Sequence, residues 1–213
     1  MRINQDTLAT ALERAHAAMP RLTDVLNAAD AKLGDGDTGT MLARLIATFA
    51  AVDVRATPDL GTAFMALAKA GAASTGSSLG TLVITAMMTA GKASASQSSL
   101  GWDRLGPLIA AIRDAAMARG KAELGAKTII DGLDALAQAL AGQDDPAVMA
   151  KAAAEAMQAV LDDFRPRPCT MGRARMFADR SIGLDDPGML ALAELVWAIV
   201  GSQEARHGET ALA

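Results

Sequence analysis

The stretch that decides the fold runs from Leu22 to Phe49 and reads L-T-D-V-L-N-A-A-D-A-K-L-G-D-G-D-T-G-T-M-L-A-R-L-I-A-T-F. Apolar residues recur at helical spacing at both of its ends, whereas its middle, from Asp30 to Gly39, interleaves carboxylates with glycines. The stretch therefore predicts two amphipathic helices joined by a short acidic loop.

Three carboxylates lie within eight residues of this loop, at Asp30, Asp35 and Asp37. Their mutual repulsion opposes folding unless a cation neutralises them, and Mg²⁺ takes oxygen ligands and is usually shared with substrate phosphates. The loop thus predicts a holder for a Mg–nucleotide. A simpler interpretation stays open, in which the loop is a polar turn and Asp37 or Thr38 caps a helix that starts near Thr40.

Two other readings of the loop fail on their surroundings. Gly34 to Gly39 formally matches the dinucleotide fingerprint G-x-G-x-x-G, but that fingerprint follows a strand, and this loop follows a helical pattern. A calcium-binding EF-hand is excluded as well, because the twelfth position counted from Asp35 is Ile46 rather than Glu.

Helical periodicity continues along the rest of the chain, and no segment reads convincingly as a strand. Pro20 marks either a kink or the first turn of a second helix, and Gly, Pro or Asp-Pro signals separate almost all the other patterns. These patterns cover residues 8–29, 41–49, 58–71, 79–91, 102–119, 127–140, 146–164 and 187–201. We expect a single domain over residues 1–213: an all-α, antiparallel bundle or barrel of about eight helices, with loops gathered at two ends.

The composition agrees with a helical domain and limits the kinds of partner. Hydrophobic residues make up 51% of the 213 residues but aromatic residues only 3%, so helices should pack closely through small side chains. The single Cys169 excludes an intrachain disulfide and a cysteine-based zinc site. The first residues lack a signal-like apolar segment, no apolar run approaches the ~18 residues of a membrane span, and the net charge is −4. We therefore expect a cytoplasmic protein without a nucleic-acid or membrane partner.

Two further segments carry glycines and hydroxyl groups at helix starts. Gly71 to Thr81 exposes backbone N–H groups at a helix N-terminus and suits an anion, but Ser/Thr capping with glycines for close packing explains it equally well. It lacks the lysine of a P-loop. In Arg119 to Asp131, Thr128 or Asp131 could cap the helix that follows, and a solvated connector is the simpler interpretation.

The last segment, from Arg165 to Gly188, is rich in arginine. Its part up to Gly183 carries five arginines against one acid, Asp179, a local balance of +4 in a protein of net −4. The planar guanidinium suits phosphate, although most charge runs are solvated surface. The segment becomes a candidate phosphate site because the acidic and hydroxyl-rich loops already call for one.

These four segments together resemble the L subunits of dihydroxyacetone kinases, which carry the nucleotide-binding Dak2-type domain. That family has D-x-x-x-G-D-x-D-H-G, G-G-x-S-G-x-x-x-G-T, R-G-K-A-x-x-G-D-K-T-x-x-D and G-R-A-x-x-x-x-x-R-S-x-G-x-x-D-P-G, in this order. The present chain has D-A-K-L-G-D-G-D-T-G, A-A-S-T-G-S-S-L-G-T, R-G-K-A-E-L-G-A-K-T-I-I-D and G-R-A-R-M-F-A-D-R-S-I-G-L-D-D-P-G. The resemblance spans Asp30 to Gly188, and four co-linear motifs do not arise by chance.

The resemblance implies an eight-helix barrel with ADP or ATP at one rim, its phosphates held through two Mg²⁺ ions by Asp30, Asp35 and Asp37. It also implies a set of residues along the nucleotide: Thr38, Gly39, Thr40, Met41, Thr75, Gly76, Gly120, Ile129, Arg173, Asp186, Pro187 and Gly188. In phosphoryl transfer the protein mostly positions groups and neutralises charge, so this equipment is adequate.

The chain departs from the family pattern at several places. The family histidine is Thr38 here, the next family positions are Thr40 and Met41, the paired glycines of the second motif are Ala72-Ala73, and the aspartate before Lys-Thr is Ala126. These changes leave the three carboxylates in place. They point to a divergent branch, which raises a four-carbon ketose such as erythrulose as an alternative substrate.

In this family a histidine on a separate K subunit holds the ketose, and the only histidines here, His16 and His207, lie outside the motifs. We therefore expect no ketose-binding residue in this chain and a requirement for a DhaK-like partner. ATP exchange, or rephosphorylation of bound ADP by a phosphohistidine phosphotransferase-system protein, would both suit the site, and a homodimer is allowed. The alternatives are a regulatory protein that senses nucleotide state and a Mg-dependent phosphohydrolase, which lacks a candidate histidine base.

Overall fold

The computed structural model describes residues 2–171 and 178–201. Within these ranges the chain forms eight α-helices and no β-strand, apart from one isolated bridge between Ile3 and Leu100. Short 3₁₀ turns, Val54–Ala56 and Trp102–Arg104, precede the third and fifth helices. The helices are α1 (Gln5–Asp30), α2 (Thr38–Ala50), α3 (Leu60–Ala72), α4 (Ser78–Ala93), α5 (Leu105–Gly120), α6 (Ile129–Ala139), α7 (Pro146–Phe164) and α8 (Pro187–Val200). The predicted all-α class is confirmed.

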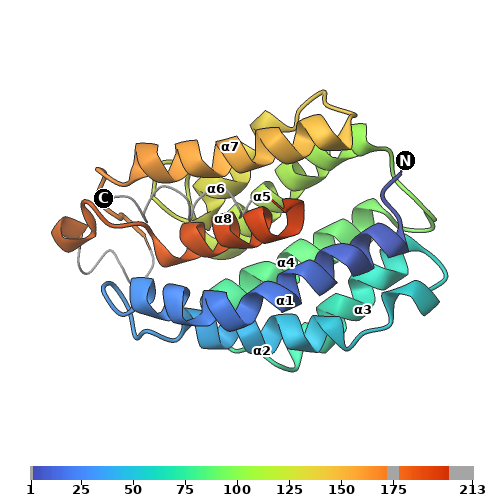
Figure 1. Cartoon of the computed structure of the whole chain (residues 1–213), viewed down its shortest axis with the longest axis horizontal. Coiled ribbons are helices and arrows are strands. Elements are labelled where there is room, and N and C mark those ends of the chain that lie inside the picture. Colours follow the sequence, from blue (N-terminus) through green and yellow to red (C-terminus); the bar gives the residue numbers. More distant parts are fainter. Residues whose placement is uncertain (1, 172–177, 202–213) are drawn as a thin grey trace.

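The helices lie along a common long axis, and each packs against the next one in sequence (Figure 1). Because α8 also packs against α1, the contacts close into a ring, which is compatible with the expected barrel. The loops that follow α1 and α7 meet at the left end of Figure 1, and the N-terminus lies at the opposite end.

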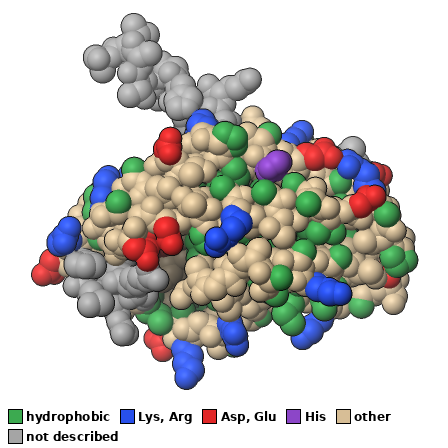
Figure 2. Space-filling view, turned by 90° about the horizontal axis from the view of Figure 1, so that it is seen from below, with side chains coloured by type: hydrophobic (Ala, Val, Ile, Leu, Met, Phe, Trp, Pro, Cys, Tyr) green, Lys and Arg blue, Asp and Glu red, His purple; other side chains and the backbone are tan. Residues whose placement is uncertain are grey.

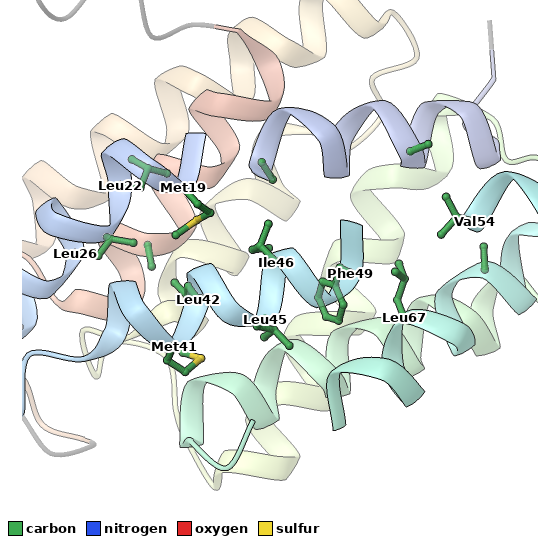
Figure 3. Packing of buried hydrophobic residues seen from close by; sticks show 14 residues of the cluster. Met19, Leu22, Leu26, Met41, Leu42, Leu45, Ile46, Phe49, Val54 and Leu67 are labelled. Atoms are coloured by element: carbon green, nitrogen blue, oxygen red, sulfur yellow. The ribbon is translucent and has the colours of Figure 1, made fainter. Parts of the chain in front are cut away.

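The hydrophobic core consists of two clusters that α8 joins. One cluster contains buried residues of α1, α2 and α3 and includes Ala191 of α8; the other contains buried residues of α5, α6 and α7 and includes Met189 and Trp197 of α8. Figure 3 shows the first cluster, in which Leu22 and Leu26 of α1 face the side chains of α2. With residues in both clusters, α8 orients the two halves of the molecule relative to each other.

Helices α1 and α2 approach closely because Gly39 has no side chain. A Cβ atom at Gly39 would overlap the backbone carbonyl of Thr23. On the same side, the Asn27 amide donates to Thr40 Oγ1 at 3.0 Å, and its Oδ1 accepts from the Thr40 backbone N–H at 3.1 Å. These contacts fix the start of α2 against the end of α1, and hence the shape of the acidic loop between them.

Two expected helix boundaries differ in the structure. Helix α1 continues through Pro20 to Asp30, so the prediction that a second helix could start there is wrong. Pro20 is exposed, and the hydrophobic faces before and after it remain in register, so packing holds the helix together. Helix α3 starts at Leu60 rather than at Pro58, because Asp59 takes the N-cap position and accepts the Thr62 N–H at 2.7 Å.

Candidate functional site

A cavity of about 230 Å³ lies where the first turns of four helices converge. The even-numbered helices all begin at this cavity, which is a consequence of alternating helix direction around the ring. Met41 and Leu82 lie just beyond two of the four segments that the sequence singled out, and the rest of the lining comes from within those segments. The full lining is Asp30, Leu33, Asp35, Asp37, Thr38, Met41, Ser77, Ser78, Leu79, Leu82, Thr128, Ile129, Met171, Asp186, Pro187 and Gly188.

Asp30 ends α1 and at the same time organises the start of α2. Its Oδ2 accepts the backbone N–H groups of Asp37 at 3.0 Å and Thr38 at 3.2 Å, while its backbone carbonyl accepts from Gly34 at 2.6 Å. A Cβ atom at Gly34 would overlap Asp30 Oδ1, so a side chain at this position would displace the Asp30 carboxylate. Asp37 occupies the N-cap position of α2, as the simpler interpretation allowed, but its side chain makes no capping bond to the helix.

The three carboxylates gather into one cluster. One oxygen each from Asp30, Asp35 and Asp37 lies within 4.8 Å of the others; Asp30 is buried, and the other two are exposed. Two oxygens bound to one Mg²⁺ are at most about 4.2 Å apart, so a small side-chain adjustment brings the trio onto a shared ion. Three hard oxygen donors, one of them already oriented by backbone N–H groups, therefore fit Mg²⁺.

The start of α4 lies at the same cavity as the carboxylates. Ser77 caps this helix, with its Oγ accepting the Gly80 N–H at 2.9 Å. Thr75 Oγ1 accepts the Ser77 N–H at 3.4 Å, and a Cβ atom at Gly80 would overlap the Thr75 hydroxyl. The predicted Ser/Thr cap is confirmed, and it leaves the first residues of α4 on the cavity wall.

Helices α6 and α8 complete the cavity with acidic caps. Thr128 and Asp131 form a capping box at the start of α6, as predicted, and Asp131 also accepts the Gly125 N–H. At α8, Asp186 Oδ2 accepts the Met189 N–H at 2.8 Å. Burial raises the pKa of the Asp186 carboxyl to about 6, although the backbone N–H groups of Met189 and Gly188 act in the opposite direction.

The electrostatics of the cavity combine both signs. The N-terminal ends of α2, α4, α6 and α8 each direct the positive end of a helix dipole at it. The carboxylate cluster on the first wall is negative. Such an arrangement suits an anion that carries a divalent cation, with the cation at the carboxylates and the anion at the helix N-termini.

The structure brings nine of the predicted site residues to the cavity wall, namely Asp30, Asp35, Asp37, Thr38, Met41, Ile129, Asp186, Pro187 and Gly188. Gly39 and Thr40 serve the α1–α2 contact instead. Thr75 lines a neighbouring groove between α4 and α5, Gly120 ends α5 beside Leu82, and Gly76 has nothing within 4 Å of a would-be Cβ. Arg173 lies outside the described residues.

Several lining residues were not named from the sequence. Leu33 and Met171 from loops and Leu79 and Leu82 from α4 supply apolar surface, and a single apolar residue carries no signal that distinguishes a cavity wall from the core. Ser77, Ser78 and Thr128 fall within the singled-out segments. Their positions at helix starts were the available signal for them.

The arginines at the start of the last segment do not face the cavity. Arg165 forms a bidentate ion pair with Asp185, at 2.9 and 3.2 Å, and also pairs with Asp162. Arg167 pairs with Asp163 and lies over the ring of Phe164. The prediction that the arginine run as a whole offers phosphate ligands is wrong for these two, because nearby carboxylates already neutralise them.

Other features of the surface bear on partners. Figure 2 shows acidic side chains at both ends of this face of the molecule, including the left end, at which the α1–α2 loop lies in Figure 1. His16 is exposed on α1 and does not line the cavity, whereas His207 lies outside the described residues. Among the described helices, none combines the length and the apolar character that a membrane crossing requires.

Comparison with known proteins places these features in a family. A family model described as the DAK2 domain matches residues 32–201. The chain is 28% identical over 180 residues to the ADP-binding subunit DhaL of PEP-dependent dihydroxyacetone kinase 1 of Listeria innocua, covering 84% of this chain and 87% of that protein. It is 30% identical over 203 residues to the L-erythrulose kinase of Pectobacterium atrosepticum, covering 90% of this chain but 34% of that kinase.

A solved structure shows the same arrangement of helices. The dihydroxyacetone kinase from C. freundii, in complex with AMP-PNP and Mg²⁺, matches with a TM-score of 0.67 and 25% sequence identity. The match covers 92% of this chain and 33% of that kinase chain. The present chain therefore spans about a third of the length of the longer kinases that it matches.

Proposed function

Because the chain belongs to the DAK2 domain family, we propose that it is the ADP- or ATP-binding, Mg²⁺-dependent subunit of a short-chain ketose kinase. The observation that carries the proposal is the meeting of three carboxylates with four helix N-termini at one cavity. A cation-bridged polyphosphate satisfies both parts of this arrangement, and a bare anion or an isolated cation satisfies only one.

In the proposed complex, Asp30, Asp35 and Asp37 would hold Mg²⁺, two ions in our proposal, beside the phosphates of the nucleotide. The bound Mg²⁺ would supply positive charge to the transferred phosphoryl group, and the N-terminal N–H groups of α4 would orient the phosphate oxygens. The role of the chain is to bind and orient the donor. Relatives support this role, because the Listeria innocua protein is an ADP-binding subunit and the C. freundii kinase was solved with AMP-PNP and Mg²⁺.

The nucleotide base would bind at the apolar side of the cavity. Met41, Leu82 and Ile129 lie there with the Pro187-Gly188 turn, and a purine ring stacks on apolar walls of this kind. Thr38 also lines the cavity. It stands where the family has a histidine, and its side chain is smaller and uncharged. Contacts of the nucleotide with Gly39, Thr40, Thr75, Gly76, Gly120 and Arg173 remain predictions.

The acceptor side of the reaction requires a partner. We propose that a separate DhaK-like subunit holds the ketose and docks at the end of the molecule where the cavity lies. Dihydroxyacetone is the first candidate acceptor, and L-erythrulose is the second, since the chain is 30% identical to an L-erythrulose kinase. Residues 1–213 as one domain, a cytoplasmic location, and a phosphohistidine protein as phosphoryl source belong to the same proposal.

The proposal is tested on the purified chain. Acid release followed by mass spectrometry identifies any ligand that co-purifies, and the stripped chain is then mixed with a DhaK-like subunit and each ketose in turn. Bound ADP, with phosphoryl transfer from phosphohistidine protein, supports the cofactor mode, and transfer from free ATP supports the exchanging mode. Absence of nucleotide binding and of phosphoryl transfer under both conditions contradicts the kinase proposal. It also contradicts the regulatory alternative, because a sensor of nucleotide state must bind nucleotide.

A further inference from the structure

A buried lysine occupies the centre of the described part of the α7–α8 connection. The Lys127 side chain has no exposed surface, and its ammonium donates to the backbone carbonyls of Arg165 at 3.1 Å, Arg167 at 2.7 Å and Ser181 at 2.8 Å. An ammonium has three N–H donors, so three carbonyls satisfy it completely. Lysine is rarely buried to this extent, and here a set of carbonyl dipoles compensates its charge.

The three carbonyls belong to two stretches of the α7–α8 connection, one on each side of residues 172–177. We call residues 165–171 the first arm and residues 178–186 the second arm. The arms are joined around Lys127, because the Gly183 N–H donates to the Arg165 carbonyl at 2.8 Å and the Cys169 N–H donates to Ser181 Oγ at 2.7 Å. Lys127 therefore fastens the end of α7 to the approach to α8.

The first arm is also hydrogen-bonded to the segment that leads into α6. The Thr170 N–H donates to the Ala126 carbonyl at 3.2 Å, next to Lys127 in the chain. Lys127 itself adopts a left-handed backbone conformation, with φ of 59°, which is uncommon for a residue with a side chain. Such a conformation persists where surrounding contacts over-determine it, and the three ammonium bonds are contacts of this kind.

Two walls of the cavity consist of residues next to Lys127 or on the arms that it holds. Thr128 and Ile129 follow Lys127 directly and form one wall, while Met171 of the first arm and Asp186 of the second arm form the other. The lysine does not itself line the cavity, and its donors are already occupied by carbonyls. Its geometry therefore excludes direct contact with a ligand and leaves a role in building the walls.

We propose that Lys127 is a positioning residue, which clamps both arms of the α7–α8 connection to the start of α6 and thereby sets the shape of the nucleotide site. The inference rests on the proposed function where it concerns nucleotide, but the clamp itself is a property of the ligand-free protein. The two parts therefore have separate measurements.

The first measurement tests the clamp without any ligand. Lys127→Met keeps the length of the side chain and removes the ammonium, and Lys151→Met, an exposed lysine on α7, is the matched control. We expect trypsin to cut after Arg180, in the second arm, at least about tenfold faster in Lys127→Met than in the wild type, with helical circular dichroism unchanged. Arg165 and Arg167 are each followed by proline and resist trypsin, so Arg180 is the site that reports on the arms. Cleavage at the wild-type rate overturns the clamp.

The second measurement compares metal binding with nucleotide binding, and so separates an effect on the cavity walls from a general loss of stability. Mn²⁺ binding at the carboxylates, followed by electron paramagnetic resonance, should change less than about twofold, because the Lys127 ammonium donates to carbonyls outside the Asp30 loop. Affinity for ADP in saturating Mn²⁺ should fall at least about tenfold. Unchanged ADP affinity, or equal losses for both ligands, overturns the proposal. A wild-type protein that binds no ADP defeats the proposed function, and the proteolysis result still decides the clamp.

A second variant covers failure to fold. Lys127→Gln retains N–H donors that satisfy part of the carbonyl set, so cleavage rate and ADP affinity should fall between those of the wild type and of Lys127→Met. Loss of helical structure in both variants would assign Lys127 to the general stability of the fold and would overturn the positioning role.

Discussion

The carboxylate of Asp30 accepts the backbone N–H of Thr38 at 3.2 Å, so the last residue of α1 caps the first turn of α2. The same side chain belongs to the carboxylate cluster that fits Mg²⁺. One residue therefore combines a structural role with the metal-binding role that we propose for the cluster, and experiments on Asp35 and Asp37 can separate the two.

Replacing Asp30 by alanine should lower both stability and ligand binding. The variant loses the acceptor for two N–H groups of α2, and loss of a helix cap costs about 1 kcal/mol. Asp37→Ala is the matched comparison, because Asp37 makes no capping bond. Urea unfolding in EDTA should show the larger loss for Asp30→Ala, and equal stability of the two variants would contradict the capping role.

Asp35→Asn should abolish Mg²⁺-dependent nucleotide binding and leave the helices intact. The exposed Asp35 carboxylate contributes one of the three clustered oxygens, and a neutral amide weakens the hold on a divalent cation. Asp24→Asn, an exposed aspartate on α1, controls for the change in net charge. Binding of ADP at wild-type affinity in Mg²⁺ would show that the metal assignment is wrong.

Gly39→Ala should destabilise the fold by about 1–3 kcal/mol, because its Cβ would meet the backbone carbonyl of Thr23 and force α1 and α2 apart. Gly76→Ala is the control, since a Cβ at Gly76 has nothing within 4 Å and its φ is not positive. Thermal denaturation measures the difference. A Gly39→Ala protein that melts with the wild type would refute the close approach.

Asp186 should make stability depend on pH in the metal-free protein. Its pKa is raised from 3.8 to about 6 in the folded chain, so the folded state holds the proton more tightly than the unfolded state. The stabilising contribution of the neutral acid is complete below pH 3.8 and is lost as the pH rises through about 6, a change of about 3 kcal/mol.

Asp186→Asn removes this titration and keeps a good N-cap residue. The variant should match the wild type in urea unfolding near pH 4 and exceed it above pH 7, with EDTA present throughout. A stability difference that is the same at every pH, or a wild type that is more stable at pH 8, would contradict the burial of this carboxyl.

The helices and the carboxylate cluster were predictable because both leave a periodic or local signature. Apolar spacing located the eight helices of the described residues, and three aspartates of one short loop are close in space because they are close in sequence. The family membership, predicted from four ordered motifs, is confirmed by the DAK2 match over residues 32–201.

The rest of the site depends on contacts between segments that sequence periodicity does not report. Asp30 replaced Asp37 as the cap of α2 because the turn at Gly34 brings its carboxylate back over the next helix. The Arg165 guanidinium turned away from the cavity because Asp185, twenty residues later, folds onto it. Lys127 reads in the sequence as a residue of a solvated connector, whereas the two arms around it bury it completely.

The most direct measurement of the central claim is a calorimetric titration of the stripped protein with ADP and ATP, in Mg²⁺ and in EDTA. The account predicts tight binding of both nucleotides in Mg²⁺, a loss of at least about a hundredfold in EDTA, and no binding by Asp35→Asn under either condition. Nucleotide binding that is indifferent to Mg²⁺, or no binding at all, would contradict a cavity built for a cation-bridged polyphosphate.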